Sequence, residues 1–232
     1  MTTDVIMANK EEYLNRCRKY IHREGIDKLL DYLENKTDFF TAPSSTSFHL
    51  NEDGGLCRHS LNVHDVAMKL VEHVYAPSVQ LETAPFSEEI SQESLAIATL
   101  FHDLCKTKIY RKTERWRKNA EGRWESYSGY EIQDEFPFGH GEKSCIILGW
   151  FLRLKQDELL AIRWHMGMSD TNMIQTFCQA AEKYPLVLFT HMADQMATNY
   201  LETNTGNKED VYRGLEAAQD DDGSEFEEAE SI

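Results

Sequence analysis

The chain has 232 residues, of which 41% are hydrophobic, enough to bury the core of one domain. Its formal net charge of −16 argues against general coating of nucleic acid and against binding to anionic membrane surfaces. One stretch departs from this acidity, because Lys106–Arg123 holds eight bases and two acids. A basic segment within an acidic chain is a candidate for a specific function.

The first two helices are predicted over residues 9–40, on either side of Glu24-Gly25, from their helical spacing of apolar residues. A loop over 41–55 leads through Gly54-Gly55 into a helix predicted over 56–74. Two prolines predict a loop over 76–88. The strongly apolar stretch that follows predicts a buried helix over 88–107.

Residues 108–138 change character, because aromatic and β-branched residues alternate with charges around a turn at 119–122. This pattern predicts a β-hairpin. Helices are predicted again over 141–154, 156–166, 172–184 and 185–202. Residues 205–232 are polar, with seven acids and no base in 220–230, and are predicted to be a disordered acidic tail. The sequence thus predicts an all-α fold: a helical bundle over 1–204 with one inserted β-hairpin.

The five cysteines are scattered and include no Cys-x-x-Cys pair, which is typical of reduced thiols. The N-terminal stretch lacks the apolar segment of a signal peptide, and no run of residues is long enough to span a bilayer. We therefore expect a cytoplasmic protein with no membrane partner.

The most informative residues are His102 and Asp103, which follow the apolar run 94–101. Burying an imidazole and a carboxylate costs several kcal/mol, on the order of the desolvation penalty, unless they are paired. A metal ion offsets this cost where further ligands of the same kind are available. Residues of the same kind end or follow other apolar or glycine-rich runs: His59, His140, His165 and Asp194. A single histidine of this kind is more often a hydrogen-bonded core residue, but the repeated pattern favours a metal site.

The remaining histidines are interpreted differently. His64 lies five residues after His59, roughly 140° around a helix, and so points to another face. We interpret it as a surface residue or one behind the ligands. The same interpretation applies to His22, His49, His73 and His191, of which His191 is the most open because it precedes Asp194 by one turn.

Four motifs together resemble the HD-domain superfamily of metal-dependent phosphohydrolases: Gly54-Gly55-Leu56-Cys57-Arg58-His59, Leu100-Phe101-His102-Asp103, Gly139-His140-Gly141 and Trp164-His165. They are similar to the HD region of YhaM-type 3′→5′ exoribonucleases and to two-metal HD phosphodiesterases of cyclic dinucleotides. The resemblance implies a first ion on His59, His102, Asp103 and Asp194. It also implies a second ion on His140 and His165, with Asp103 as the bridge.

This nitrogen-rich donor set suits two divalent transition-metal ions, Mn²⁺, Fe²⁺, Co²⁺ or Ni²⁺. The catalytic residues implied are Asp103 and Lys106, with Lys106 also binding the phosphate. The hairpin follows Lys106 directly, so its bases are candidates for binding an anionic substrate: Arg111, Lys112, Arg115 and Arg117. Trp116 and Trp124 could stack on bases, or these aromatic residues could pair across the strands while the charges face water.

We therefore expect a metal-activated hydroxide to cleave a phosphoester of a nucleotide or short oligonucleotide, and no binding of long duplex nucleic acid. Residues 1–47 are too short for the OB-type domain of the exoribonucleases, which puts processive RNA degradation in doubt. Cyclic-dinucleotide phosphodiesterase and 3′→5′ exoribonuclease remain alternatives within the class. Outside it, the alternatives are a non-catalytic metal-binding module that senses nucleotides or recruits a protein partner through its acidic tail, and a metal-free helical domain.

Overall fold

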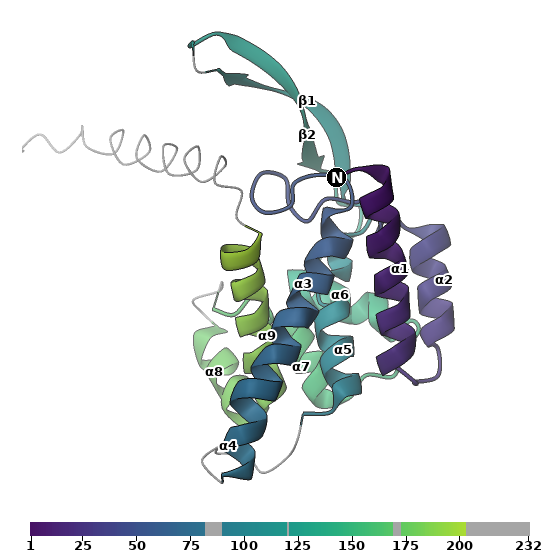
Figure 1. Cartoon of the computed structure of the whole chain (residues 1–232), viewed down its shortest axis with the longest axis vertical. Coiled ribbons are helices and arrows are strands. Elements are labelled where there is room, and N and C mark those ends of the chain that lie inside the picture. The colour runs from purple at the N-terminus through teal and green to yellow at the C-terminus, as the bar shows by residue number, and fades with distance from the viewer. Residues whose placement is uncertain (82–89, 120, 169–172, 203–232) are drawn as a thin grey trace, which may run out of the picture.

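The computed structural model describes residues 1–81, 90–119, 121–168 and 173–202. Helices form the body and a single hairpin projects from it, as Figure 1 shows. Within the described residues, no helix has the length and apolar character needed to cross a membrane. The helices are α1 Thr3–Tyr20, α2 Ile26–Lys36, α3 Gly55–Leu70, α4 Ala76–Gln80, α5 Gln92–Leu100, α6 His140–Gly149, α7 Gln156–Arg163, α8 Ile174–Lys183 and α9 Pro185–Met196.

Helix α5 lies at the centre of the body, in contact with α1, α3, α7 and α9. Its sequence is apolar on every side, and each residue from Ser94 to Leu100 is buried. Helices α3 and α9 pack on α5 and on each other, whereas α1 and α2 lie on one flank. This arrangement brings the ends of α3, α5 and α9 to the same region of the molecule, close to the base of the hairpin (Figure 1).

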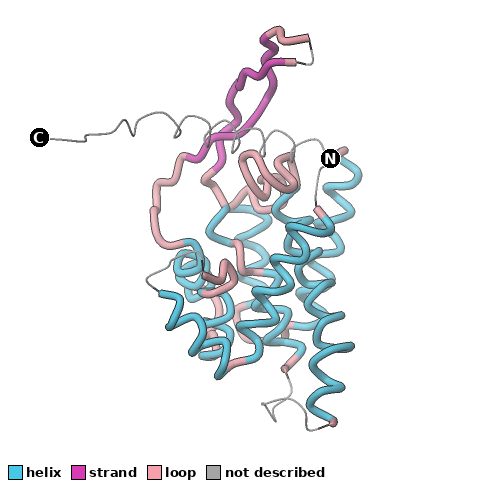
Figure 2. The backbone as a smooth tube through the Cα atoms, turned by 90° about the vertical axis from the view of Figure 1, so that its left-hand side faces the viewer, coloured by secondary structure: helices cyan, strands magenta, loops and turns pink. Residues whose placement is uncertain are grey.

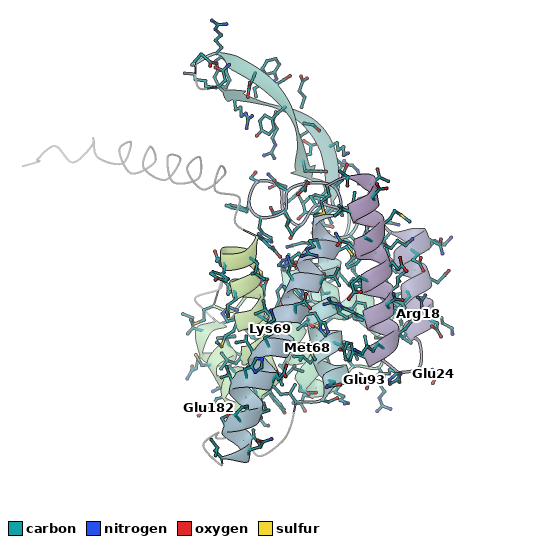
Figure 3. All side chains as sticks on the ribbon, in the orientation of Figure 1. Arg18, Glu24, Met68, Lys69, Glu93 and Glu182 are labelled. Atoms are coloured by element: carbon teal, nitrogen blue, oxygen red, sulfur yellow. The ribbon has the colours of Figure 1, made fainter. Side chains whose placement is uncertain are left out.

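The hairpin consists of β1 Tyr110–Lys118 and β2 Trp124–Ile132, paired antiparallel from Tyr110↔Ile132 to Lys118↔Trp124. Its base is anchored, because Tyr110 and Tyr130 are buried. Its distal part leaves the body, as the magenta strands of Figure 2 show, and Trp116 and Trp124 are 60% and 64% exposed. In Figure 3 the side chains of the body fill the space between the helices, whereas those at the hairpin tip point outward.

The all-α fold with one hairpin is confirmed, but the helix predicted over 88–107 is wrong in its second half. Helix α5 ends at Leu100, and His102 and Asp103 lie in the turn before a short 3₁₀ helix, η2 Leu104–Lys106. The physical reason is local. His102 Nδ1 donates a hydrogen bond to the carbonyl oxygen of Thr99 at 2.8 Å, which satisfies one of the orphan carbonyls at the helix end.

Two other differences are smaller. The loop predicted over 76–88 begins as helix: α3 continues through a π-helical turn, η1 Val71–Tyr75, into α4. Pro77 fits there because it occupies the first turn of α4, where its missing N–H costs little. Helix α9 likewise runs into a π-helical turn, η4 Ala197–Leu201. The tail predicted over 205–232 lies outside the described residues.

Candidate metal centre

Helix α3 places His59 in the centre through a tight turn at Gly54-Gly55. Gly54 has a φ of +82°, which L side chains rarely adopt. A Cβ on Gly55 would clash with the carbonyl oxygen of Leu50. The two glycines therefore let the preceding loop turn closely into α3, and His59 lies in the first turns of that helix with its ring buried.

The turn after α5 places His102 and Asp103, which are 0% and 2% exposed. The bond to Thr99 occupies Nδ1 of His102 and leaves Nε2 to face the centre. That Nε2 lies 3.1 Å from Nε2 of His59. Two imidazole nitrogens at this distance, both turned to one point, are the arrangement expected of ligands to a common ion.

The other two histidines come from the N-terminus of α6 and from the turn after α7, which lie close together. His140 begins α6, and His165 follows α7 with its Nδ1 bound to the carbonyl oxygen of Ile162 at 2.7 Å. Nε2 of His165 is buried and has no hydrogen-bond partner. Gly141 allows the two histidines to approach, because a Cβ there would clash with the backbone of Arg163.

Helix α9 supplies Asp194, which is buried and has Oδ1 3.2 Å from Nε2 of His59. The structure thus brings all the predicted ligands into one cluster, which is buried except for the partly exposed His140: His59, His102, Asp103, His140, His165 and Asp194. The ligand atoms of His59, His102 and Asp194 lie within 4.8 Å of one another, and so do those of His102, Asp103 and His165. The unpartnered Nε2 of His165 fits a bound ion, because a buried polar atom without a partner is costly.

The Asp103 carboxylate lies between two pairs of histidines. Its Oδ2 is 3.4 Å from Nε2 of His59 and 3.3 Å from Nε2 of His102. Its Oδ1 is 2.8 Å from Nε2 of His140 and 3.5 Å from Nε2 of His165. Each carboxylate oxygen therefore faces a different pair of imidazoles.

Lys106 lies against the same carboxylate, with Nζ 2.7 Å from Oδ2 of Asp103 and a side chain only 12% exposed. Burial raises the pKa of Asp103, but Lys106 and His102 lower it more, so the carboxylate stays ionised. Burial lowers the pKa of Lys106, but Asp103 raises it above its usual value. A fixed cation thus lies at the edge of the cluster.

The charge state of His59 follows from its acidic neighbours. Burial lowers its pKa, but Glu202 and Asp194 raise it to about 10. For Asp194, burial raises the pKa and the bond with His59 lowers it, with a net shift downward. In the metal-free protein, His59 therefore carries the proton that an ion would replace.

Sequence reasoning missed Glu202, whereas His49 was interpreted as a surface residue or one behind the ligands, and the structure places it behind His59. Glu202 is buried, and its Oε2 lies 3.0 Å from Nδ1 of His59. His49 lies in the loop before α3, with its ring centroid 4.9 Å from that of His59 and its Nε2 4.0 Å from Oε2 of Glu202. Burial is the main cause that lowers the pKa of His49, to about 4. The only available signal was position: Glu202 follows Asp194 by eight residues in one predicted helix.

The outcomes for the other histidines are mixed. His22 and His73 are exposed, as expected of surface residues. The surface option for His64 is wrong, because the ring is buried and its Nδ1 lies 3.0 Å from Oγ1 of Thr99. His191 supports the cluster from behind, with its Nδ1 bound to the carbonyl oxygen of His165 at 2.7 Å.

The hairpin bases bind neighbours at the hairpin and its base. Nζ of Lys112 lies 2.7 Å from Oδ2 of Asp53, and Arg117 pairs with Glu125 at 2.8 Å. Arg111 donates to the carbonyl oxygen of Tyr110, and Arg115 donates to the Ser47 hydroxyl and to the carbonyl oxygen of Tyr130. None of these described contacts reaches the histidine–aspartate cluster.

The comparisons with known proteins come to one positive finding. Searches of curated proteins and of solved structures find no match. The HD domain family model matches residues 56–201, a segment that contains all six clustered ligands. Proteins of this family are generally metal-dependent phosphohydrolases, and the chain has a cluster of histidine and aspartate that could hold a metal ion. The chain belongs to the HD domain family.

Proposed function

We propose that the chain is a phosphohydrolase that works with two divalent transition-metal ions held by the six clustered residues. His59, His102 and Asp194 would hold the first ion, His140 and His165 would hold the second, and Asp103 would be shared between the two. The observation that carries this proposal is the Asp103 carboxylate, whose two oxygens face different pairs of imidazoles. When bound, the ions supply a hydroxide at neutral pH and polarise the phosphoryl group.

The donor set guides the choice of metal. Four imidazoles and two carboxylates, with no thiolate among the six proposed ligands, suit Mn²⁺, Fe²⁺, Co²⁺ or Ni²⁺. The protein prepares the ligands, because hydrogen bonds from Nδ1 of His59, His102 and His165 leave each Nε2 facing inward. Such fixed ligands reduce the reorganisation needed when an ion binds.

Lys106 is proposed to bind a phosphoryl oxygen of the substrate. Its Nζ is held against Asp103 and its charge is retained, so it can neutralise charge that develops on the phosphoryl oxygens. Asp103 is the second catalytic residue, since it orients both the ions and Lys106.

The substrate proposed is a nucleotide or a short oligonucleotide in the cytoplasm. We propose that the substrate's phosphates are bound by four basic residues of the hairpin: Arg111, Lys112, Arg115 and Arg117. To do so, these side chains would give up the hydrogen bonds and ion pairs that they make in the structure. The exposed rings of Trp116 and Trp124 support an oligonucleotide, because exposed aromatic rings offer stacking surfaces for bases. Cyclic dinucleotides and short RNA therefore belong in the first substrate screen.

The test is metal content, measured by elemental analysis on protein purified without a histidine tag. The chain offers a matched control, because His64-Asp65 repeats the dipeptide His102-Asp103 outside the cluster and Asp65 pairs with Arg16. We expect about two ions per chain in the wild type and in Asp65→Ala. We expect Asp103→Ala to lose metal and Mn²⁺-dependent hydrolysis of bis(p-nitrophenyl) phosphate.

Two results would contradict the proposal. An Asp103→Ala protein with full activity would exclude the bridging role of this carboxylate. A wild-type protein that binds no metal after incubation with Mn²⁺, Fe²⁺ or Ni²⁺ would exclude a metal-dependent reaction at this cluster.

A further inference from the structure

Glu202 lies behind His59, on the side of the ring away from the other ligands. Its two carboxylate oxygens are 3.1 and 3.0 Å from Nδ1 of His59. The other ring nitrogen, Nε2, faces His102, Asp103 and Asp194 at 3.1 to 3.4 Å. The imidazole of His59 therefore contacts the Glu202 carboxylate through one ring nitrogen and the proposed metal ligands through the other.

The Glu202 carboxylate is itself held in place. Nδ2 of Asn62, one turn after His59 on α3, donates to its Oε1 at 2.8 Å. The backbone N–H of Glu202 binds the carbonyl oxygen of Ala197 at 3.0 Å, which closes the π-helical turn after α9. The side chain is only 1% exposed. A carboxylate so buried and doubly bound has few ways to move.

This geometry fixes which nitrogen of His59 is free. An imidazole that donates its Nδ1–H to a carboxylate keeps its ring orientation and leaves the Nε2 lone pair for an ion. The carboxylate also makes Nε2 a stronger donor to the metal. In His102 and His165 a backbone carbonyl oxygen accepts this bond instead. His59 thus differs from those two ligands in having an ionised acceptor.

We propose that Glu202 is a positioning residue of the metal centre: it holds His59 in the tautomer that binds the ion and does not bind the ion itself. This inference rests on the metal site of the proposed function. It extends the site one residue beyond the segment that the family model matches. It also gives the turn after α9 a role in metal binding as well as in packing.

A different role for Glu202 has to be separated from this one. Ligand atoms of His49, His59 and Glu202 lie within 4.8 Å of one another, so these residues could in principle hold an ion. In that case His59 would use Nδ1 as a ligand, and Glu202 would lose its hydrogen bond to the ring. The number of ions bound distinguishes the two roles.

The experiment titrates the full-length, metal-free chain with Mn²⁺ alone and follows the free ion by electron paramagnetic resonance. We expect Glu202→Ala to weaken Mn²⁺ binding by about 10- to 100-fold with the same number of ions bound. Glu202→Gln keeps an acceptor for Nδ1–H and is expected to restore most of the affinity. Asn62→Ala removes one hydrogen bond to Glu202 but leaves both His59 and the Glu202 carboxylate in the chain, so it is expected to weaken Mn²⁺ binding less than Glu202→Ala does.

Thermal melts of the metal-free variants separate binding from folding, because a purely structural role would lower the Tm of Glu202→Ala and Asn62→Ala alike. The inference is overturned if folded Glu202→Ala binds Mn²⁺ as tightly as the wild type. It is also overturned if Glu202→Ala binds one ion fewer, since Glu202 would then be a ligand. Failure of the wild type to bind Mn²⁺ would instead refute the proposed function.

Discussion

The ion pair between Arg23 and Glu158 provides a quantitative test of the packing at the end of the body far from the hairpin. Glu158 lies in the first turn of α7 and is fully buried, whereas Arg23 comes from the connection between α1 and α2. The guanidinium binds both carboxylate oxygens, at 2.5 and 2.9 Å. Its second partner, Glu93, is labelled in Figure 3. We predict that Arg23→Met strongly destabilises the protein.

The magnitude follows from what remains around Glu158. In the variant, the carboxylate keeps bonds from the Ser94 hydroxyl at 2.8 Å and the Lys155 backbone N–H at 2.7 Å but loses its buried cation. Removing one partner of a buried pair costs about 3–5 kcal/mol. Because two donors remain, we expect about 3 kcal/mol, a large share of the roughly 5–15 kcal/mol that stabilises a typical domain.

The loss should depend on pH in a defined direction. In the wild type, burial raises the pKa of Glu158, but the bonds from Arg23, Lys155 and Ser94 lower it below the usual value. The contribution of Glu158 is therefore present above the pKa of the unfolded chain and lost as the pH falls through the lowered folded value. Without Arg23, burial dominates and the folded pKa rises. The folded variant then takes up a proton as the pH falls, and its loss of unfolding free energy relative to the wild type becomes smaller.

Urea unfolding at pH 7 and pH 5 measures both effects. We expect Arg23→Met/Glu158→Gln to recover part of the stability, because a neutral amide replaces the stranded carboxylate. A loss below about 1 kcal/mol that is also independent of pH would refute the reasoning, since it is the behaviour of an exposed ion pair.

Two further predictions concern the site. The first replaces four basic residues of the hairpin together by Gln: Arg111, Lys112, Arg115 and Arg117. This variant is expected to have a higher KM for a phosphate substrate and an unchanged metal content. An unchanged KM in the folded variant would remove the hairpin from substrate binding. Metal binding should also release a proton, because the pKa of His59 is raised to about 10 without an ion. Affinity for Mn²⁺ should thus rise with pH between 6 and 8, which calorimetry in buffers of different ionisation enthalpy can measure; a flat profile would contradict it.

The residues of the cluster could be singled out from the sequence because of the segments beside them. His102 and Asp194 follow long apolar runs, and a polar side chain there must be buried with its helix. The hairpin was equally clear, since aromatic residues alternate with charges over two nine-residue strands. The family resemblance then grouped separate residues into one site, which spacing alone could not do.

Other parts depend on contacts that no local pattern reveals. His102 was predicted inside a helix, but its own bond to Thr99 ends that helix. Glu202 lies at the start of a polar stretch, so only the path of α9 past α3 reveals that it is buried. His64 faces away from His59, as its spacing predicts, yet α5 covers that side too. Long-range packing decided each of these outcomes.

The order of the histidine–aspartate cluster residues along the chain also has a consequence for how the chain folds. His59 and His102 are separated by 43 positions, and Asp103 and His140 by 37. Each pairing therefore closes a loop of tens of residues, and the chain bears this entropic cost before an ion can be held. An ion held at this cluster would bind only the native arrangement and would therefore stabilise it relative to partly folded states. Such an ion would act as a cross-link that opposes local opening of α3, α6, α9 and the turns after α5 and α7 at the same time.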